Sequence, residues 1–249
     1  MLSSLRFGAS RIGRFVADLI YPPSCSACGA ALIDAEGLCP ACWRAMPFVT
    51  RPYCDRYGTP LPVEHGSLLL SPLAIADPPV FGHARGVARY DGVARELVHG
   101  LKYGDRPELA PMMARWMVRE GQDILGKATL VMPVPMHWTR LFRRKFNQAA
   151  ALAHAIGQET GLPVDCDSLR RVRRTRPQVG LTRPERAANL QKAFQVSESS
   201  RFRVQDAKIV LVDDVMTTAA TGNAAARALL KAGAASVDLL VFALVAKGG

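Results

Sequence analysis

From residue 86 onward, short continuous apolar runs alternate with segments whose apolar residues recur at helical spacing. The apolar runs have the length of strands and cover residues 86–90, 128–135, 208–214 and 236–245. The segments between them predict helices over residues 92–104, 107–121, 147–161 and 221–234. Strands that are apolar throughout and separated by helices predict an α/β fold, in which a parallel sheet carries helices on both faces.

The chain before this region has a different pattern. Residues 1–20 combine three arginines with apolar residues near helical spacing, which predicts an amphipathic helix, although a transit peptide would share this pattern. Residues 47–82 are rich in proline and glycine, as linkers and turns are. We therefore expect an N-terminal helix over residues 1–20, a cysteine-rich module with its linker over residues 21–82, and the α/β domain over residues 83–249.

Four of the six cysteines form two Cys-x2-Cys pairs that are separated by ten residues: Cys25, Cys28, Cys39 and Cys42. Each pair can hold Zn²⁺ from one tight turn, and two pairs complete a tetrahedral shell. Four thiolates leave no open position, so we expect a structural zinc ribbon. Two disulfides or four unrelated buried thiols are the alternatives, and the chain has no secretory signal to favour disulfides.

The two remaining cysteines do not complete a second site in the sequence. Cys54 looks like half of another pair, with Tyr57 at the position of the second cysteine. His65 could join Cys54 around a metal, but two ligands do not make a site. Cys166 is isolated and is most simply a small buried residue.

The charge balance narrows the choice of partners. The 249 residues carry 32 Lys and Arg against 21 Asp and Glu, a net charge of +11, which favours nucleic acid, phosphorylated metabolites or an anionic membrane surface. No run reaches the roughly 18 uncharged apolar residues of a membrane span, so we expect no span and a cytoplasmic protein.

Candidate chemistry gathers in the string LVDDVMTTAAT, residues 211–221, where a predicted strand gives way to a predicted helix. The helix N-terminus and the hydroxyls of Thr217, Thr218 and Thr221 suit a phosphate. Asp213 and Asp214 would repel phosphate, but adjacent carboxylates can accept hydrogen bonds from vicinal sugar hydroxyls or lie near Mg²⁺. The string therefore predicts a site for a phosphorylated sugar. The alternative is that Asp214 and Thr217 only cap the helix.

The same string resembles the phosphoribosyl pyrophosphate (PRPP) loop of type I phosphoribosyltransferases. Nearly the whole chain resembles one branch, the ComF family of competence-associated, phosphoribosyltransferase-like proteins with an N-terminal zinc ribbon. The similarity includes the cysteine module and three further stretches: RYDGVARELVHGLKYGDR, MPVPMHWTRLFRRKFNQAAALAHAI and RRTRPQVGLTRPERAANLQKAF. It implies the type I phosphoribosyltransferase fold for the α/β domain.

The resemblance also implies roles for particular residues. Asp213 and Asp214 would contact the ribose hydroxyls, and the residues that follow would cradle the 5′-phosphate: Thr217, Thr218, Ala219, Ala220 and Thr221. The loop after the strand at 129–133 would face the pyrophosphate with Pro133, Val134, Pro135 and Met136. Mg²⁺ would enter with PRPP and be held mostly by substrate oxygens and water.

Ala219 departs from the family pattern, which has glycine at this position. If residue 219 needs a positive φ, alanine costs about 1–2 kcal/mol there. Phosphate binding would then be weaker or the loop slightly reshaped.

Two basic stretches have more than one interpretation. Residues 169–190 are rich in arginine, and they resemble the flexible loop that closes over the active site, with Arg176, Gln178 and Arg186 as candidates for contact with pyrophosphate. A nucleic-acid contact and an ordinary solvated surface are the alternatives. Residues 137–148 interleave basic and aromatic residues, which suits either the core of a helix start or a grip on single-stranded nucleic acid.

Two classes of function follow from these observations. In the first, the protein is a phosphoribosyltransferase that releases pyrophosphate from PRPP, with an acceptor that no motif identifies. In the second, it is a non-catalytic factor that senses PRPP or binds single-stranded DNA, because the ComF resemblance implies a link to DNA uptake and to DNA-uptake proteins.

Overall fold

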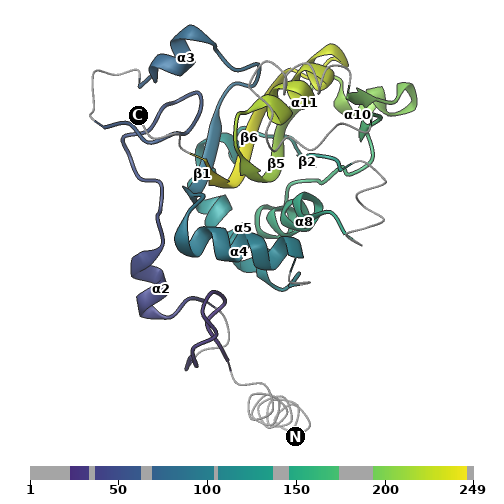
Figure 1. Cartoon of the computed structure of the whole chain (residues 1–249). Helices are drawn as coiled ribbons and strands as arrows, with labels where there is room; N and C mark the ends of the chain where they lie inside the picture. The colour runs from purple at the N-terminus through teal and green to yellow at the C-terminus, as the bar shows by residue number, and fades with distance from the viewer. Residues whose placement is uncertain are drawn as a thin grey trace, which may run out of the picture. The chain divides into compact units, whose positions relative to one another are not determined.

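The computed structural model describes residues 23–33, 37–62, 69–103, 106–136, 146–173 and 193–245. The chain divides into two compact units, Met1–Met46 and Pro47–Gly249. Each unit is described separately below. Figure 1 shows the elements of both units in colours that follow the chain.

A four-stranded parallel sheet forms the centre of the second unit. Its strand order is β1 (Ala84–Arg89), β6 (Ser236–Leu244), β5 (Lys208–Met216) and β2 (Leu130–Pro133). The two central strands are buried over almost their whole length, as expected of strands that are covered on both faces. The register pairs Met132 with Leu211 and Val212 with Leu240, so the carboxyl ends of β2 and β5 lie at the same edge.

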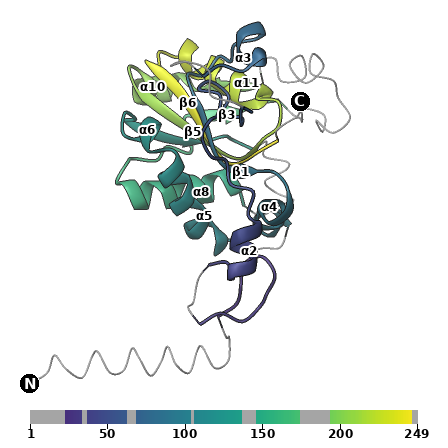
Figure 2. The same cartoon turned by 90° about the vertical axis from the view of Figure 1, so that its left-hand side faces the viewer.

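Helices cover both faces of this sheet, and the predicted fold class is confirmed. α5 (Leu109–Glu120) and α8 (Gln148–Thr160) pack on one face, while α11 (Ala220–Lys231) packs on the other (Figures 1 and 2). α4 (Gly92–Tyr103) and the short α6 (Gln122–Leu125) complete the connection between β1 and β2. Among the described residues, no helix has the length and apolar character needed to cross a membrane.

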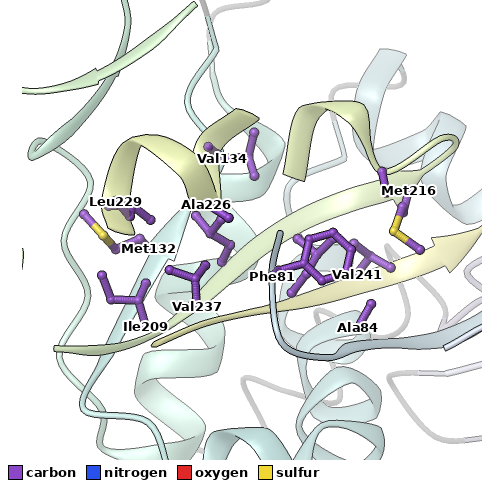
Figure 3. Close-up of a cluster of buried hydrophobic side chains, with 14 of the residues drawn as sticks. Phe81, Ala84, Met132, Val134, Ile209, Met216, Ala226, Leu229, Val237 and Val241 are labelled. Atoms are coloured by element: carbon purple, nitrogen blue, oxygen red, sulfur yellow. The ribbon is translucent and has the colours of Figure 1, made fainter. Parts of the chain in front are cut away.

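A core of apolar side chains lies between the sheet and α11 (Figure 3). Phe81 is fully buried there, together with Ile209 and Val241 from the strands and Leu229 from α11. The helix approaches closely because of Gly222, where an added Cβ would lie 3.0 Å from Leu239 and 3.3 Å from the Phe81 ring. This packing fixes the N-terminal turn of α11 against the end of β5.

A short hairpin follows α8. It consists of β3 (Leu169–Arg171) and β4 (Phe194–Val196), which pair antiparallel, and it leads through η1 (Glu198–Ser200) to α10 (Arg201–Val204). The candidate loop residues between these strands, Arg176, Gln178 and Arg186, lie outside the described residues. So does most of the second basic stretch, residues 137–145.

Residues 47–82, which we expected to hold the outer part of the cysteine-rich module and its linker, begin with a segment that packs with the sheet. Residues 47–49 run antiparallel to the edge of β1: the Val49 amide donates to the Val87 carbonyl and the Arg89 amide to the Pro47 carbonyl, both at 2.9 Å. α3 (Pro72–Ala76) follows in the same unit. These residues belong to the second compact unit, where they supply the partner for an otherwise open strand edge.

The two halves of the cysteine region repeat one turn. In the first turn, in unit one, the Cys25 amide donates to the Ala30 carbonyl and the Gly29 amide to the Cys25 carbonyl. In the second turn, in unit two, the Cys54 amide donates to the Thr59 carbonyl and the Gly58 amide to the Cys54 carbonyl. Both glycines have a positive φ, 75° and 65°, which a non-glycine residue adopts only with strain.

The similarity extends to the short helix after each turn. α2 (Pro40–Ala45) begins after Cys39, whose amide donates to the Cys25 sulfur at 3.3 Å. α3 begins after Ser71, whose amide donates to the Cys54 sulfur at the same distance. The second copy therefore keeps only one of four cysteines and has Tyr57, Ser71 and Ala74 at the other three positions.

Candidate functional site

The acid pair divides between the two faces of the sheet. Successive side chains of a strand point to opposite faces, so Asp213 shares a face with Leu211 and Ile209, which lie in the core with residues of α11. Asp214 belongs to the opposite face, where α4, α5 and α8 lie. The Asp214 amide donates to a carboxylate oxygen of Asp213 at 2.9 Å, which fixes the Asp213 side chain along the strand.

A lysine from α4 pairs with the second acid. The Lys102 ammonium lies 2.9 Å from a carboxylate oxygen of Asp214, and the two side chains are only 19% and 10% exposed. Lys102 stands in the last turn of α4, whose apolar face buries Ala94, Leu97, Val98 and Leu101. That burial holds the helix against the protein and directs its final turn to the carboxyl end of β5.

The surroundings shift the pKa values of Asp213 and Lys102. Burial raises the pKa of Asp213 to about 7, and the negative charge of Asp214 adds to this rise while Lys102 opposes it. Burial works against the charge of Lys102, but the combined attraction of Asp214, Asp213 and Tyr90 leaves the pKa of its ammonium above the usual value. Near neutral pH, Asp213 therefore exchanges a proton readily, while Lys102 stays charged.

The N-terminus of α11 lies immediately after the strand. Ala219 precedes the helix with φ 57° and ψ −1°, in the left-handed region, so the positive φ considered above does occur at this position. This conformation turns the chain so that the first amides of the helix are free of the strand. The Thr218 hydroxyl is buried and has no hydrogen-bond partner among the described residues.

A cavity of about 300 Å³ lies at the carboxyl edge of the sheet. The acid pair and Lys102 line it together with Thr217 and Thr221. Seven of its lining residues were predicted from the sequence: Asp213, Asp214, Thr217, Thr221, Val134, Pro135 and Met136. Of the remaining predicted residues, Ala219 and Ala220 line a smaller adjoining pocket, and Pro133 ends β2. Parallel sheets characteristically bind ligands at this edge.

Seven cavity-lining residues were not predicted as site residues: Tyr90, Lys102, Asn147, Gln148, Ala149, Arg171 and Val215. Asn147 caps α8, since its side-chain oxygen accepts from the Ala149 amide at 3.1 Å. Gln148 is 1% exposed, and its amide donates to the Lys102 carbonyl at 3.5 Å. A second helix N-terminus, that of α8, thus borders the same cavity.

The four cysteines of the first unit form a separate cluster. Their sulfur atoms all lie within 4.8 Å of one another, and the sulfurs of Cys28 and Cys39 are 3.8 Å apart. Four thiolates at about 2.3 Å from one zinc would be spaced by about 3.8 Å in a tetrahedron, so the cluster fits this metal. The amides of Cys39 and Cys42 donate to the sulfurs of Cys25 and Cys39, which favours thiolates.

Comparison with known protein families finds one family for the cysteine region and another for the C-terminal part of the chain. A family model described as double zinc ribbon domain matches residues 16–71, and one described as phosphoribosyl transferase domain matches residues 148–249. The chain is therefore a protein of the phosphoribosyltransferase fold with an N-terminal double zinc ribbon. The second cysteine turn, with its single cysteine, falls inside the double ribbon.

Relatives with similarity over most of the chain identify the family. DNA utilization protein YhgH of Salmonella typhimurium is 31% identical over 220 residues, which cover 86% of this chain and 87% of that protein. Competence protein F of Haemophilus influenzae is 27% identical over 216 residues, covering 83% and 90%. The chain belongs to the family of these proteins, the ComF family.

Among solved structures, the allosteric regulatory enzyme of purine biosynthesis aligns with a TM-score of 0.37 at 19% identity. The alignment covers 58% of this chain and 30% of that enzyme. The fold assignment does not depend on this weak similarity, because the sheet topology and the family model support it directly.

Proposed function

We propose that the cavity binds PRPP together with Mg²⁺ and that the protein transfers the phosphoribosyl group to an acceptor. One observation carries the proposal: an acid pair and the N-terminus of α11 open into the same cavity. The carboxylates suit the two hydroxyls of the ribose, and the helix amides with Thr217 and Thr221 suit its 5′-phosphate.

The opposite end of the ligand would lie toward β2 and α8. The residues after β2, Val134 to Met136, border the cavity together with the N-terminal turn of α8. The positive end of that helix favours the diphosphate. Arg171 from β3 also borders the cavity and offers a forked donor to phosphate oxygens.

Transfer needs no nucleophile from the protein. A nitrogen lone pair of the acceptor forms the new bond to C1 of the ribose as the bond from C1 to the diphosphate oxygen breaks, and pyrophosphate leaves with that electron pair. The contribution of the chain is to hold the ribose and the leaving group in line and to surround the developing positive sugar with Asp213 and Asp214. Mg²⁺ bound with PRPP would neutralise charge on the leaving diphosphate.

We further propose that the four-cysteine cluster holds one structural zinc ion. The closed set of four sulfurs supports a structural site, since it leaves no position for substrate. Zinc-binding thiolates require a reducing compartment, which supports the cytoplasm as the place of action.

A non-catalytic role in DNA handling is the second candidate. The names of the relatives, DNA utilization protein and competence protein, favour it. So do the net charge of +11 and the arginines at the base of the β3–β4 hairpin, Arg170, Arg171 and Arg173. In this role the protein would sense PRPP or contact single-stranded DNA and DNA-uptake proteins.

Calorimetric titration of PRPP in the presence of Mg²⁺ tests the site. The wild type should bind, Asp213→Ala should lose at least tenfold in affinity, and Glu159→Ala should match the wild type because Glu159 is an exposed acid on α8, outside the cavity lining. Equal binding by the wild type and Asp213→Ala would contradict the assignment.

Pyrophosphate release separates the two candidate functions. A panel of nitrogen acceptors should give release with at least one member if the protein is a transferase. PRPP binding without release from any acceptor would favour the sensor. Binding to single-stranded DNA that weakens steeply with salt would support phosphate contacts by the arginines.

A further inference from the structure

We infer that Lys102 is a positioning residue of the phosphorylated-sugar site, holding the Asp214 carboxylate oriented for a ribose hydroxyl. This inference rests on the proposed function and extends it to a residue of α4, outside the PRPP loop. It also identifies the positive charge that allows two adjacent carboxylates to share a cavity with a polyanionic ligand.

The geometry of the pair supports this role. The Lys102 ammonium meets one oxygen of Asp214 at 2.9 Å, so the other carboxylate oxygen can still accept a hydrogen bond. Both side chains are largely buried, and a buried pair keeps its geometry better than an exposed one. Gln148, itself buried, donates to the Lys102 carbonyl and connects the last turn of α4 to the first turn of α8.

The effect of Lys102 on the two acids depends on the other charged and titratable groups that border the cavity. Tyr90 after β1, Arg171 in β3 and Lys102 in α4 border the cavity with the two acids of β5. Burial and the charge of Asp214 raise the pKa of Asp213 while Lys102 lowers it, so without Lys102 the pKa of Asp213 would rise further. A protonated acid accepts fewer hydrogen bonds, and two ionised ones would repel the phosphates of the ligand.

The test compares Lys102→Met with Lys102→Arg, which keeps the charge. With Mg²⁺ and PRPP, we expect at least tenfold weaker binding by Lys102→Met and largely restored binding by Lys102→Arg. Lys127→Met is the matched control, since Lys127 is exposed and lies outside the cavity lining. Circular dichroism of each variant at the titration temperature establishes that the sheet and helices are formed.

A pH profile distinguishes this role from simple structural support. In the wild type, PRPP affinity should rise as Asp213 loses its proton around pH 7. In Lys102→Met, the same rise should occur at higher pH, because the cation that opposes protonation is gone. A purely structural role would lower affinity equally at every pH.

The outcomes separate the inference from the function on which it rests. Tenfold weaker binding with a displaced pH profile supports the role of Lys102. Wild-type affinity and an unchanged profile in a folded Lys102→Met overturn it, while the PRPP site itself stands. Failure of the wild type to bind PRPP overturns the proposed function and the role of Lys102 with it.

Discussion

The left-handed conformation of Ala219 leads to a quantitative prediction for Ala219→Gly. Alanine at φ 57° carries strain of about 1–2 kcal/mol, and glycine removes it. Ala219 is 4% exposed and lies in the core cluster, so the substitution also removes a buried methyl group worth about 0.8 kcal/mol. Glycine also gives the unfolded chain more conformational freedom, which lowers the free energy of unfolding by about 0.4–1 kcal/mol. These terms nearly cancel, and we expect the free energy of unfolding to change by less than about 1 kcal/mol.

Ala220→Gly is the matched control. Ala220 is the first residue of α11 and has no positive φ. Glycine at this position therefore lowers the free energy of unfolding by about 1 kcal/mol, and no strain is relieved. Urea unfolding at 25 °C, followed by circular dichroism, should therefore find Ala219→Gly more stable than Ala220→Gly by about 1 kcal/mol, with equal m-values.

Two results would refute the reasoning. If Ala219→Gly is destabilised as much as the control, then alanine carries no strain at this position. If PRPP affinity rises strongly in Ala219→Gly, then the alanine weakens PRPP binding and does not act on the stability of the fold alone. We now expect equal affinity and not the weaker phosphate binding considered from the sequence, because Ala219 already holds the turn that precedes the helix amides and its strain is present before and after binding.

Two further predictions concern the cysteine clusters and the acid pair. Metal analysis should find one zinc per chain, lost in Cys28→Ser and retained in Cys54→Ser, because Cys54 is the only cysteine of its turn; two zinc ions per chain would contradict this. Asp213→Asn should stabilise the ligand-free protein at pH 8 by on the order of 1–3 kcal/mol and much less at pH 4. The pKa of Asp213 is about 7 when folded and 3.8 otherwise, so its stabilising proton is lost as pH rises through that interval. An equal effect on thermal unfolding at both pH values would exclude this linkage.

The order of elements could be predicted because each strand and helix has its own apolar pattern. The strand at 208–214 continues to Met216, since Val215 and Met216 still pair with β6. The two short strands β3 and β4 were not predicted, because strands of three residues are too short to show a period of two. The proline and glycine content of residues 47–82 predicts turns, but it does not reveal that residues 47–49 pair with β1.

The candidate site could be predicted only where it is local in sequence. Asp213, Asp214 and the threonines follow one another along a strand end and a helix start, so their chemistry is visible in one string. Lys102 and Arg171 come from distant elements, and only the folded sheet brings them to the acids. A faint signal for Lys102 exists, since it lies four residues after the buried Val98 and so on the same side of α4.

The repeat in the cysteine region is also clearer in three dimensions. Tyr57 is followed directly by Gly58, as Cys28 is by Gly29, but three of the four ligand positions have changed. In their place, Tyr57 packs edge-on against Phe81, with ring centres 6.2 Å apart, and its hydroxyl donates to the Asp77 carbonyl. The shared hydrogen bonds preserve the turn although the sequence pattern has faded.

The second cysteine turn has packed side chains where the first has metal ligands, and this affects how the protein folds when zinc is scarce. The second turn belongs to the compact unit that carries the sheet, and its centre consists of Cys54, Tyr57 and Ala74, all buried. Its folding free energy therefore comes from packing and not from a bound ion. When zinc is scarce, we expect the first cysteine turn alone to lose order, while the cavity at the carboxyl edge of the sheet still forms.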